Sequence, residues 1–86
     1  MVITNLRGNI DRTQYTADIG IHTGKARYSL LYRCTDTEHA MRLISARDNK
    51  VVAHERVDRP GLLSWAEVRS WAITVASAAL RAEHTN

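Results

Sequence analysis

The stretch that decides the fold lies at residues 14–33 and reads QYTADIGIHTGKARYSLLYR. Apolar and polar residues alternate on both sides of Thr23-Gly24, which is the period-two pattern of half-buried strands joined by a turn. Pairing across that turn gives four apolar pairs: Ile21 with Ala26, Ile19 with Tyr28, Ala17 with Leu30, and Tyr15 with Tyr32. A shift by one residue would destroy this match, so the pattern predicts a β-hairpin of well-specified register.

Residues 36–47 admit two interpretations. Thr35-Asp36-Thr37-Glu38 fits a helix capping box, and the residues that follow are acceptable in a helix. Against this, Asp48-Asn49 is a turn pair and Val51-Val52 begins a further strand. We therefore favour a second hairpin over a helix. Its expected pairs are Ala46 with Val51, Ile44 with Ala53, Arg42 with Glu55, and Ala40 with Val57.

The C-terminal part of the chain predicts a long helix. Arg59-Pro60-Gly61 interrupts the strand pattern and ends the sheet. Ser64 and Glu67 then form a Ser-x-x-Glu capping box, and Leu63 with Val68 forms a hydrophobic staple. We expect the helix to start after the Ser64 cap and to extend to about residue 83.

Together these elements predict an α+β fold: a four-stranded antiparallel sheet of two hairpins, with one long C-terminal helix packed on one face. A chain of 86 residues accommodates a single domain, 1–86. Within it we expect an N-terminal segment at 1–13, the sheet at 14–58 and the helix at 64–83. One cysteine excludes an intrachain disulfide. With neither a secretory signal nor an apolar stretch of about 20 residues, we expect a cytoplasmic protein without membrane contact.

The basic residues of the predicted sheet collect on the face away from the helix. The net charge is only +3, but ten of the twelve basic residues are Arg, whose planar fork of donors suits phosphates and carboxylates. The expected binding residues on this basic face are Lys25, Arg27, Arg33, Arg47, Lys50, His54 and Arg56. Met41 and Leu43 are expected there too, with Asp18 as its one acid. All three tyrosines are expected on the core face, which argues against recognition of single strands by base stacking.

The predicted helix is more apolar than a single core contact requires. Glu67, Ser70, Thr74, Ser77 and Arg81 form a narrow polar stripe, and nearly all other positions are apolar. One interpretation is that alanines are good helix formers that tolerate exposure. We favour a contact with another subunit or target, because aromatic anchors are typical of interfaces. The expected interface residues are Trp65, Arg69, Trp71, Ile73 and Leu80, and the expected assembly is a homodimer.

Chemistry-bearing motifs are weak. Residues 20–26 are similar to a phosphate loop, but the spacing is one residue short and the stretch lies in a hairpin, so we interpret it as a turn. Cys34, Asp36 and His39 lie close in sequence without a defined catalytic pattern, and the four histidines show no zinc-ligand spacing. We predict no catalytic, cofactor or metal site and no enzymatic activity. A toxin-like nuclease using His54 is the third option.

In size and layout the chain resembles small inhibitor proteins encoded by phages and mobile elements, including anti-CRISPR proteins. The resemblance rests on a compact sheet-plus-helix chain without a catalytic motif, and it transfers no site residues. It implies a non-enzymatic protein that docks on a host protein or nucleoprotein complex through the basic face, the apolar helix or both. The alternative is a dimeric regulator that binds DNA or RNA directly through the basic face, which would make binding steeply salt-dependent.

Overall fold

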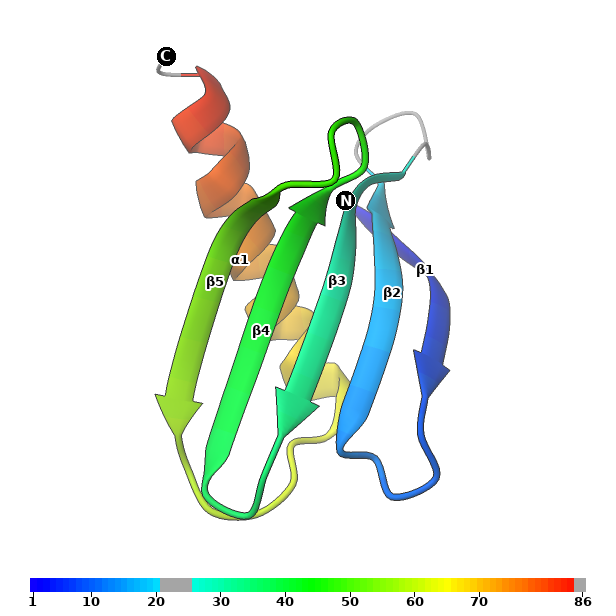
Figure 1. Cartoon of the computed structure of the whole chain (residues 1–86), viewed down its shortest axis with the longest axis vertical. Coiled ribbons are helices and arrows are strands. Elements are labelled where there is room, and N and C mark those ends of the chain that lie inside the picture. Colours follow the sequence, from blue (N-terminus) through cyan, green and yellow to red (C-terminus); the bar gives the residue numbers. More distant parts are fainter. Residues whose placement is uncertain (21–25, 85–86) are drawn as a thin grey trace.

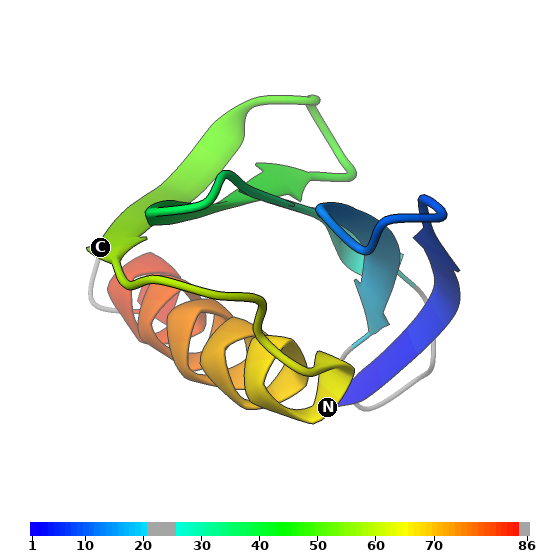
Figure 2. The ribbon, with the colours of Figure 1, turned by 90° about the horizontal axis from the view of Figure 1, so that it is seen from below.

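The computed structural model describes residues 1–20 and 26–84, which form a five-stranded antiparallel sheet and one helix (Figure 1). The strands follow one another in space as in sequence: β1 (Val2–Gly8), β2 (Gln14–Gly20), β3 (Ala26–Cys34), β4 (Glu38–Ser45) and β5 (Val51–Asp58). The helix α1 (Trp65–His84) crosses one face, and the sheet curves around it (Figure 2). The predicted α+β class, antiparallel sheet and C-terminal helix are confirmed, but the predicted count of four strands was wrong.

The missing strand is β1, which the sequence prediction left in an N-terminal segment. β1 pairs with β2, joining Ile3 to Ile19 and Gly8 to Tyr15. A bulge between Thr4 and Arg7, with Asn5 at a φ of 54°, breaks the alternation along the strand. The sheet therefore begins at residue 2 rather than 14. The sequence analysis missed β1 because the bulge interrupts the alternation of apolar and polar residues by which a strand is recognised.

Gly8 allows the ring of its partner Tyr15 to lie across β1. A Cβ atom at Gly8 would lie 2.8 Å from Cδ1 and Cε1 of Tyr15, so any other residue there would displace that ring. The Tyr15 ring in turn packs on Trp65, with the two ring centroids 5.4 Å apart. This close approach connects the edge of the sheet to the first turn of α1.

The first hairpin has the predicted register over most of its length. Three predicted pairs are confirmed: Ile19 with Tyr28, Ala17 with Leu30, and Tyr15 with Tyr32. Beyond Ile19 the register shifts, so that Ala26 pairs with Gly20 rather than with the predicted Ile21. The predicted turn at residues 23–24 lies outside the described residues, as does Lys25.

Residues 38–45 form a strand, as favoured, but the register of the second hairpin was wrong. A turn centred on Asp48-Asn49 was expected to place Ala46 opposite Val51. Instead Ser45 and Lys50 close the loop, with the Ser45 amide donating to the Lys50 carbonyl at 2.8 Å and Asn49 at a φ of 59°. A bulge then shifts the pairing between Ile44, opposite Val51, and Leu43, opposite Ala53.

This shift exchanges the two faces of β4, because the side-chain period of a strand is two. Met41 and Leu43, predicted on the basic face, are fully buried under α1. Arg42 pairs with His54 and not with the predicted Glu55. The buried core comprises Tyr15, Ala17, Ile19, Tyr28, Leu30, Tyr32, Met41, Leu43, Val68, Ala72, Val75 and Ala76.

The start of α1 follows the predicted capping box. The Glu67 amide donates to Ser64 Oγ at 3.2 Å, and the Ser64 amide donates to Glu67 Oε1 at 3.4 Å. Val68 is buried and Leu63 packs against the core, consistent with the expected staple. In the described part of the chain, no helix has the length and apolar character needed to cross a membrane.

Candidate binding face

The face of the sheet that α1 leaves uncovered, here called the outer face, carries a group of cationic side chains on β3, β4 and β5. The ladder pairing places Arg33, Ala40 and Arg56 side by side in one row across these strands. The next row holds Leu31, Arg42 and His54. The small Ala40 side chain thus has Arg33 and Arg56 on its two sides. Arg42 and His54 lie in the neighbouring row.

These side chains surround an open hollow of about 380 Å³, here called the Ala40 hollow. It is lined by Arg33, Cys34, Thr35, Glu38, Ala40, Arg42, His54 and Arg56. Arg33, Arg42, His54 and Arg56 are exposed, whereas Ala40 is half-buried at its centre. The sequence prediction placed Arg33, His54 and Arg56 on one face, and the structure brings these three together.

Arg42 is the residue that sequence reasoning missed at this site. The predicted register, which turned Met41 and Leu43 outward, thereby placed Arg42 on the core face, and this would have required burying its guanidinium under the helix. That cost is a signal against the predicted register of β4. The true register moves Arg42 outward and raises the positive charge around Ala40.

The charge around the hollow is only partly compensated within the chain. Arg56 forms an ion pair with Glu38 at the rim. Within residues 1–20 and 26–84, the structure gives no hydrogen bond or ion pair for the side chains of Arg33, Arg42 and His54. On the side of Ala40 opposite to the Arg42 row, Glu38 and Asp58 form a further row. The outer face therefore carries acidic residues besides Asp18. The hollow therefore has a positive centre with one acidic side.

The remaining predicted cations lie at the far end of the strands. Arg27 and Arg47 line a smaller hollow of about 220 Å³ beside the turn between β4 and β5. Lys50 is exposed directly after that turn. These residues are thus separate from the Ala40 hollow, and the predicted basic face divides into two groups.

A second, larger hollow of about 560 Å³ lies on the outer face toward β1. Its lining includes the apolar Leu31 and Ile44, together with Arg7. Asp18 in its wall accepts a hydrogen bond of 2.7 Å from Asn5 Nδ2. The three tyrosines are in the core and both tryptophans are on α1, so the described part of the outer face carries no tyrosine or tryptophan ring for base stacking.

The predicted helix interface is partly used inside the chain. The Trp65 ring packs on Tyr15, and the Trp71 ring meets Tyr32 edge-on at 6.4 Å while its Nε1 donates to Glu55 at 3.2 Å. Ile73 and Leu80 are half-buried, and Arg69 is exposed. In the described part of the chain, the exposed large apolar residues are Met1, Val2, Leu6, Ile10, Val51, Val52, Val57 and Leu62, none of them on α1.

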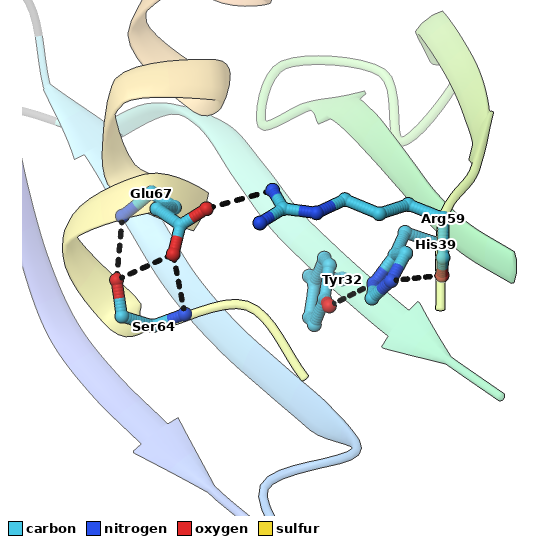
Figure 3. Close-up of polar contacts among 5 residues, drawn as sticks. All are labelled: Tyr32, His39, Arg59, Ser64 and Glu67. Atoms are coloured by element: carbon cyan, nitrogen blue, oxygen red, sulfur yellow. Dashed lines mark hydrogen bonds and ion pairs between the residues drawn. The ribbon is translucent and has the colours of Figure 1, made fainter. Parts of the chain in front are cut away.

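Among the candidates Cys34, Asp36 and His39, it is His39 whose side chain is held by hydrogen bonds within the buried core. Both of its ring nitrogens are engaged (Figure 3). Nε2 lies 3.0 Å from the carbonyl oxygen of Arg59, which can only accept, so Nε2 carries the proton. Nδ1 then accepts the hydrogen of the Tyr32 hydroxyl at 2.6 Å. Burial, followed by the neighbouring Cys34 thiol, raises the pKa of the Tyr32 phenol above its ordinary value of 10.0.

Arg59 links this chain of hydrogen bonds to the helix α1. Its guanidinium lies 2.8 Å from Glu67 Oε2, and this contact is the first cause that lowers the pKa of the Glu67 carboxyl below 4.5. Its carbonyl holds His39, so one residue connects the sheet to the start of α1. The arrangement is structural: it leaves His39 no nitrogen with which to activate Cys34.

Comparison with protein-family models, curated proteins and solved structures gives no match to this chain. In the described part of the chain, no group of three or more His, Cys, Asp or Glu side chains is placed to hold a metal ion. The distinguishing property of the outer face is uncompensated positive charge around a small central residue.

Proposed function

We propose that this chain is a non-enzymatic binding protein that docks through its outer face on a partner presenting clustered negative charge. The observation that carries the proposal is the pair Arg33 and Arg42 around Ala40, whose charges have no partner in the described part of the chain, with the exposed His54 imidazole beside them. Arginine is enriched at recognition surfaces because its planar fork donates several hydrogen bonds at once. The partner class that fits best is a host complex that handles nucleic acid, as expected for an inhibitor encoded by a mobile element.

The state of His39 supports a binding role over a catalytic one. Its two ring nitrogens are occupied by Tyr32 and Arg59, and its side chain is fully buried. A general base needs a nitrogen within reach of substrate. His54 is exposed at the Ala40 hollow, but among the described residues no titratable group is hydrogen-bonded to it to orient it.

The second candidate is a regulator that binds DNA or RNA directly through the same face. The row Arg7, Thr16, Leu31, Arg42 and His54 runs across all five strands and favours this reading, because it places basic groups near both edges of the sheet. Such binding would be to phosphates. Five strands span about 19 Å, which is too broad for a major groove about 12 Å wide.

Affinity capture from a host lysate, with and without nuclease, tests the proposal. The tagged wild type is compared with the triple variant Arg33→Ala, Arg42→Ala, Arg56→Ala and with a control triple, Arg47→Ala, Arg69→Ala, Arg81→Ala. Both triples remove three positive charges, but only the first removes them from the Ala40 hollow. We expect the first to lose the captured complex and the control to retain it. Equal capture by both triples would refute docking through the outer face.

A further inference from the structure

We infer that the arginines around the Ala40 hollow form a binding site for successive phosphate groups of a nucleic-acid backbone. This inference rests on the proposed function and names the anion that the outer face recognises. Arg33 and Arg56 lie on either side of Ala40 in one row, two strand spacings or about 9.6 Å apart. Arg42 belongs to the next row, about 6.8 Å along the strands. Three guanidinium groups on three adjacent strands thus surround one small side chain.

The number of donors favours phosphate over a protein carboxylate. One arginine fork satisfies both oxygens of a carboxylate in a bidentate pair. Three arginines around one point offer more donors and more charge than a single carboxylate can use, even with Glu38 occupying part of Arg56. A backbone phosphate, like a carboxylate, carries one negative charge on two free oxygens, but it is followed by other phosphates along the strand, so each arginine can contact a different one. The half-buried Ala40 leaves room for one of them at the centre.

The distribution of charge around the hollow indicates a path for a polyanion. Glu38 and Asp58 occupy the row next to Ala40 on one side and would repel phosphates there. On the other side the row through Arg42 leads across the sheet to Arg7 on β1. A nucleic-acid backbone would therefore cross the strands along this row rather than run along them toward Thr35.

The residue types and the breadth of the outer face indicate that it would contact phosphates rather than bases. In the described part of the chain it has no tyrosine or tryptophan ring for stacking, and the sheet is too broad to enter a major groove, so we expect little reading of the bases. Binding then depends on phosphate density, which is highest in a duplex. We expect duplex DNA to bind more tightly than a single strand of the same sequence. A stacking protein would show the reverse order.

The test uses fluorescence anisotropy with a fluorescein-labelled 20-base-pair duplex, the matching single strand and polyglutamate as a competing carboxylate polymer. With three phosphates contacted, raising salt from 50 to 200 mM should weaken duplex binding about 40-fold, since the logarithmic slope is about −0.9 per phosphate. Arg42→Gln removes one contact and should reduce this to about 12-fold. Arg47→Ala removes an equal charge at the turn and should leave the slope unchanged.

Two further variants separate a defined site from diffuse attraction. Ala40→Leu keeps every charge but fills the hollow, and it should weaken duplex binding about tenfold while its circular dichroism stays that of the wild type. Glu38→Gln frees Arg56 and should tighten binding. Should Ala40→Leu unfold the chain, Arg42→Gln with its Arg47→Ala control carries the test alone.

Three results would overturn the phosphate site: no duplex binding by the wild type at 50 mM salt, competition by polyglutamate equal to that by unlabelled duplex, or equal slopes for Arg42→Gln and Arg47→Ala. None of them alone removes the proposed function. A carboxylate-bearing host complex could still be captured through Arg33, Arg42 and Arg56. Only the loss of that capture difference would remove it.

Discussion

At the residue scale, the Tyr32–His39 pair explains how a polar side chain is accommodated in the core of so small a protein. His39 is fully buried, yet its Nδ1 accepts from Tyr32 and its Nε2 donates to the Arg59 carbonyl. Buried polar groups cost little when every donor and acceptor is satisfied, and much when one is not. The Tyr32 hydroxyl is therefore a structural group, and its high pKa keeps it protonated as a donor across the ordinary pH range.

Removing that hydroxyl should destabilise the fold. Tyr32→Phe leaves Nδ1 of the buried His39 without a donor, and we predict a loss of about 1–3 kcal/mol in the free energy of unfolding. Urea denaturation followed by tryptophan fluorescence measures it. Tyr15→Phe is the control, because the Tyr15 hydroxyl makes no hydrogen bond to any other described residue. Equal effects of the two substitutions would contradict the role assigned to Tyr32.

Leu43 and Ile44 test the register of β4 directly, because they are neighbours on opposite faces. Leu43 is fully buried, whereas Ile44 lines the hollow on the outer face. We predict that Leu43→Ala lowers the free energy of unfolding by about 2–5 kcal/mol, the cost of a core cavity. Ile44→Ala should cost less than half as much in the same urea titration. The reverse order would restore the register expected from the sequence.

At the scale of elements, the segment from Arg59 to Glu67 fixes where α1 begins. Ser64 and Glu67 cap the first turn, and Arg59 pairs with Glu67. The pKa of the Glu67 carboxyl is lowered by the Arg59 hydrogen bond and next by the Ser64 amide. A group whose pKa is lower in the folded state than in the unfolded state adds stability at pH values above its unfolded pKa. That contribution is lost as the pH falls through the folded value.

The resulting prediction concerns the pH dependence of unfolding. Between pH 7 and pH 3 the wild type should lose more stability than Glu67→Gln, since the variant has no carboxyl to protonate at this position. Thermal unfolding at several pH values measures the two curves. Asp48, whose pKa is also lowered, contributes equally to both. Parallel curves would show that the Arg59–Glu67 contact does not stabilise the folded state.

The elements also show what the sequence could predict. The first hairpin and the helix start were predictable because their signals are local: three matched apolar pairs that the structure confirms in one case and a capping box in the other. β1 was not, because its bulge at Asn5 removes the alternation. The predicted register of the second hairpin was wrong because the turn pair Asp48-Asn49 does not indicate a loop closed by Ser45 and Lys50, nor the bulge that follows it. Because of this wrong register, the sequence analysis placed Arg42 and Ala40 on the core face and did not find them as part of the candidate site.

At the scale of the whole molecule, the exposed apolar residues indicate which surface the predicted homodimer would use. The predicted homodimer was assigned to α1, but the tryptophans of the helix pack partly into the core. Exposed apolar residues occur instead on the edge strands, with Val51, Val52 and Val57 on β5 alone 55%, 39% and 45% exposed. An edge strand also presents unpaired backbone donors and acceptors to a second chain. If the chain dimerises, β5 is therefore the better surface.

We predict a dimer of twice the 9.7 kDa chain mass in size-exclusion chromatography with light scattering at high micromolar concentration. Val57→Lys places a charge on the β5 edge and should give the monomer mass, because a lysine on an edge strand opposes edge-to-edge pairing. Ala78→Lys places the same charge on an exposed position of α1 and should leave the dimer intact. A monomer with Ala78→Lys and a dimer with Val57→Lys would return the contact to the helix. A monomeric wild type would leave the outer face as the only proposed contact surface of the chain.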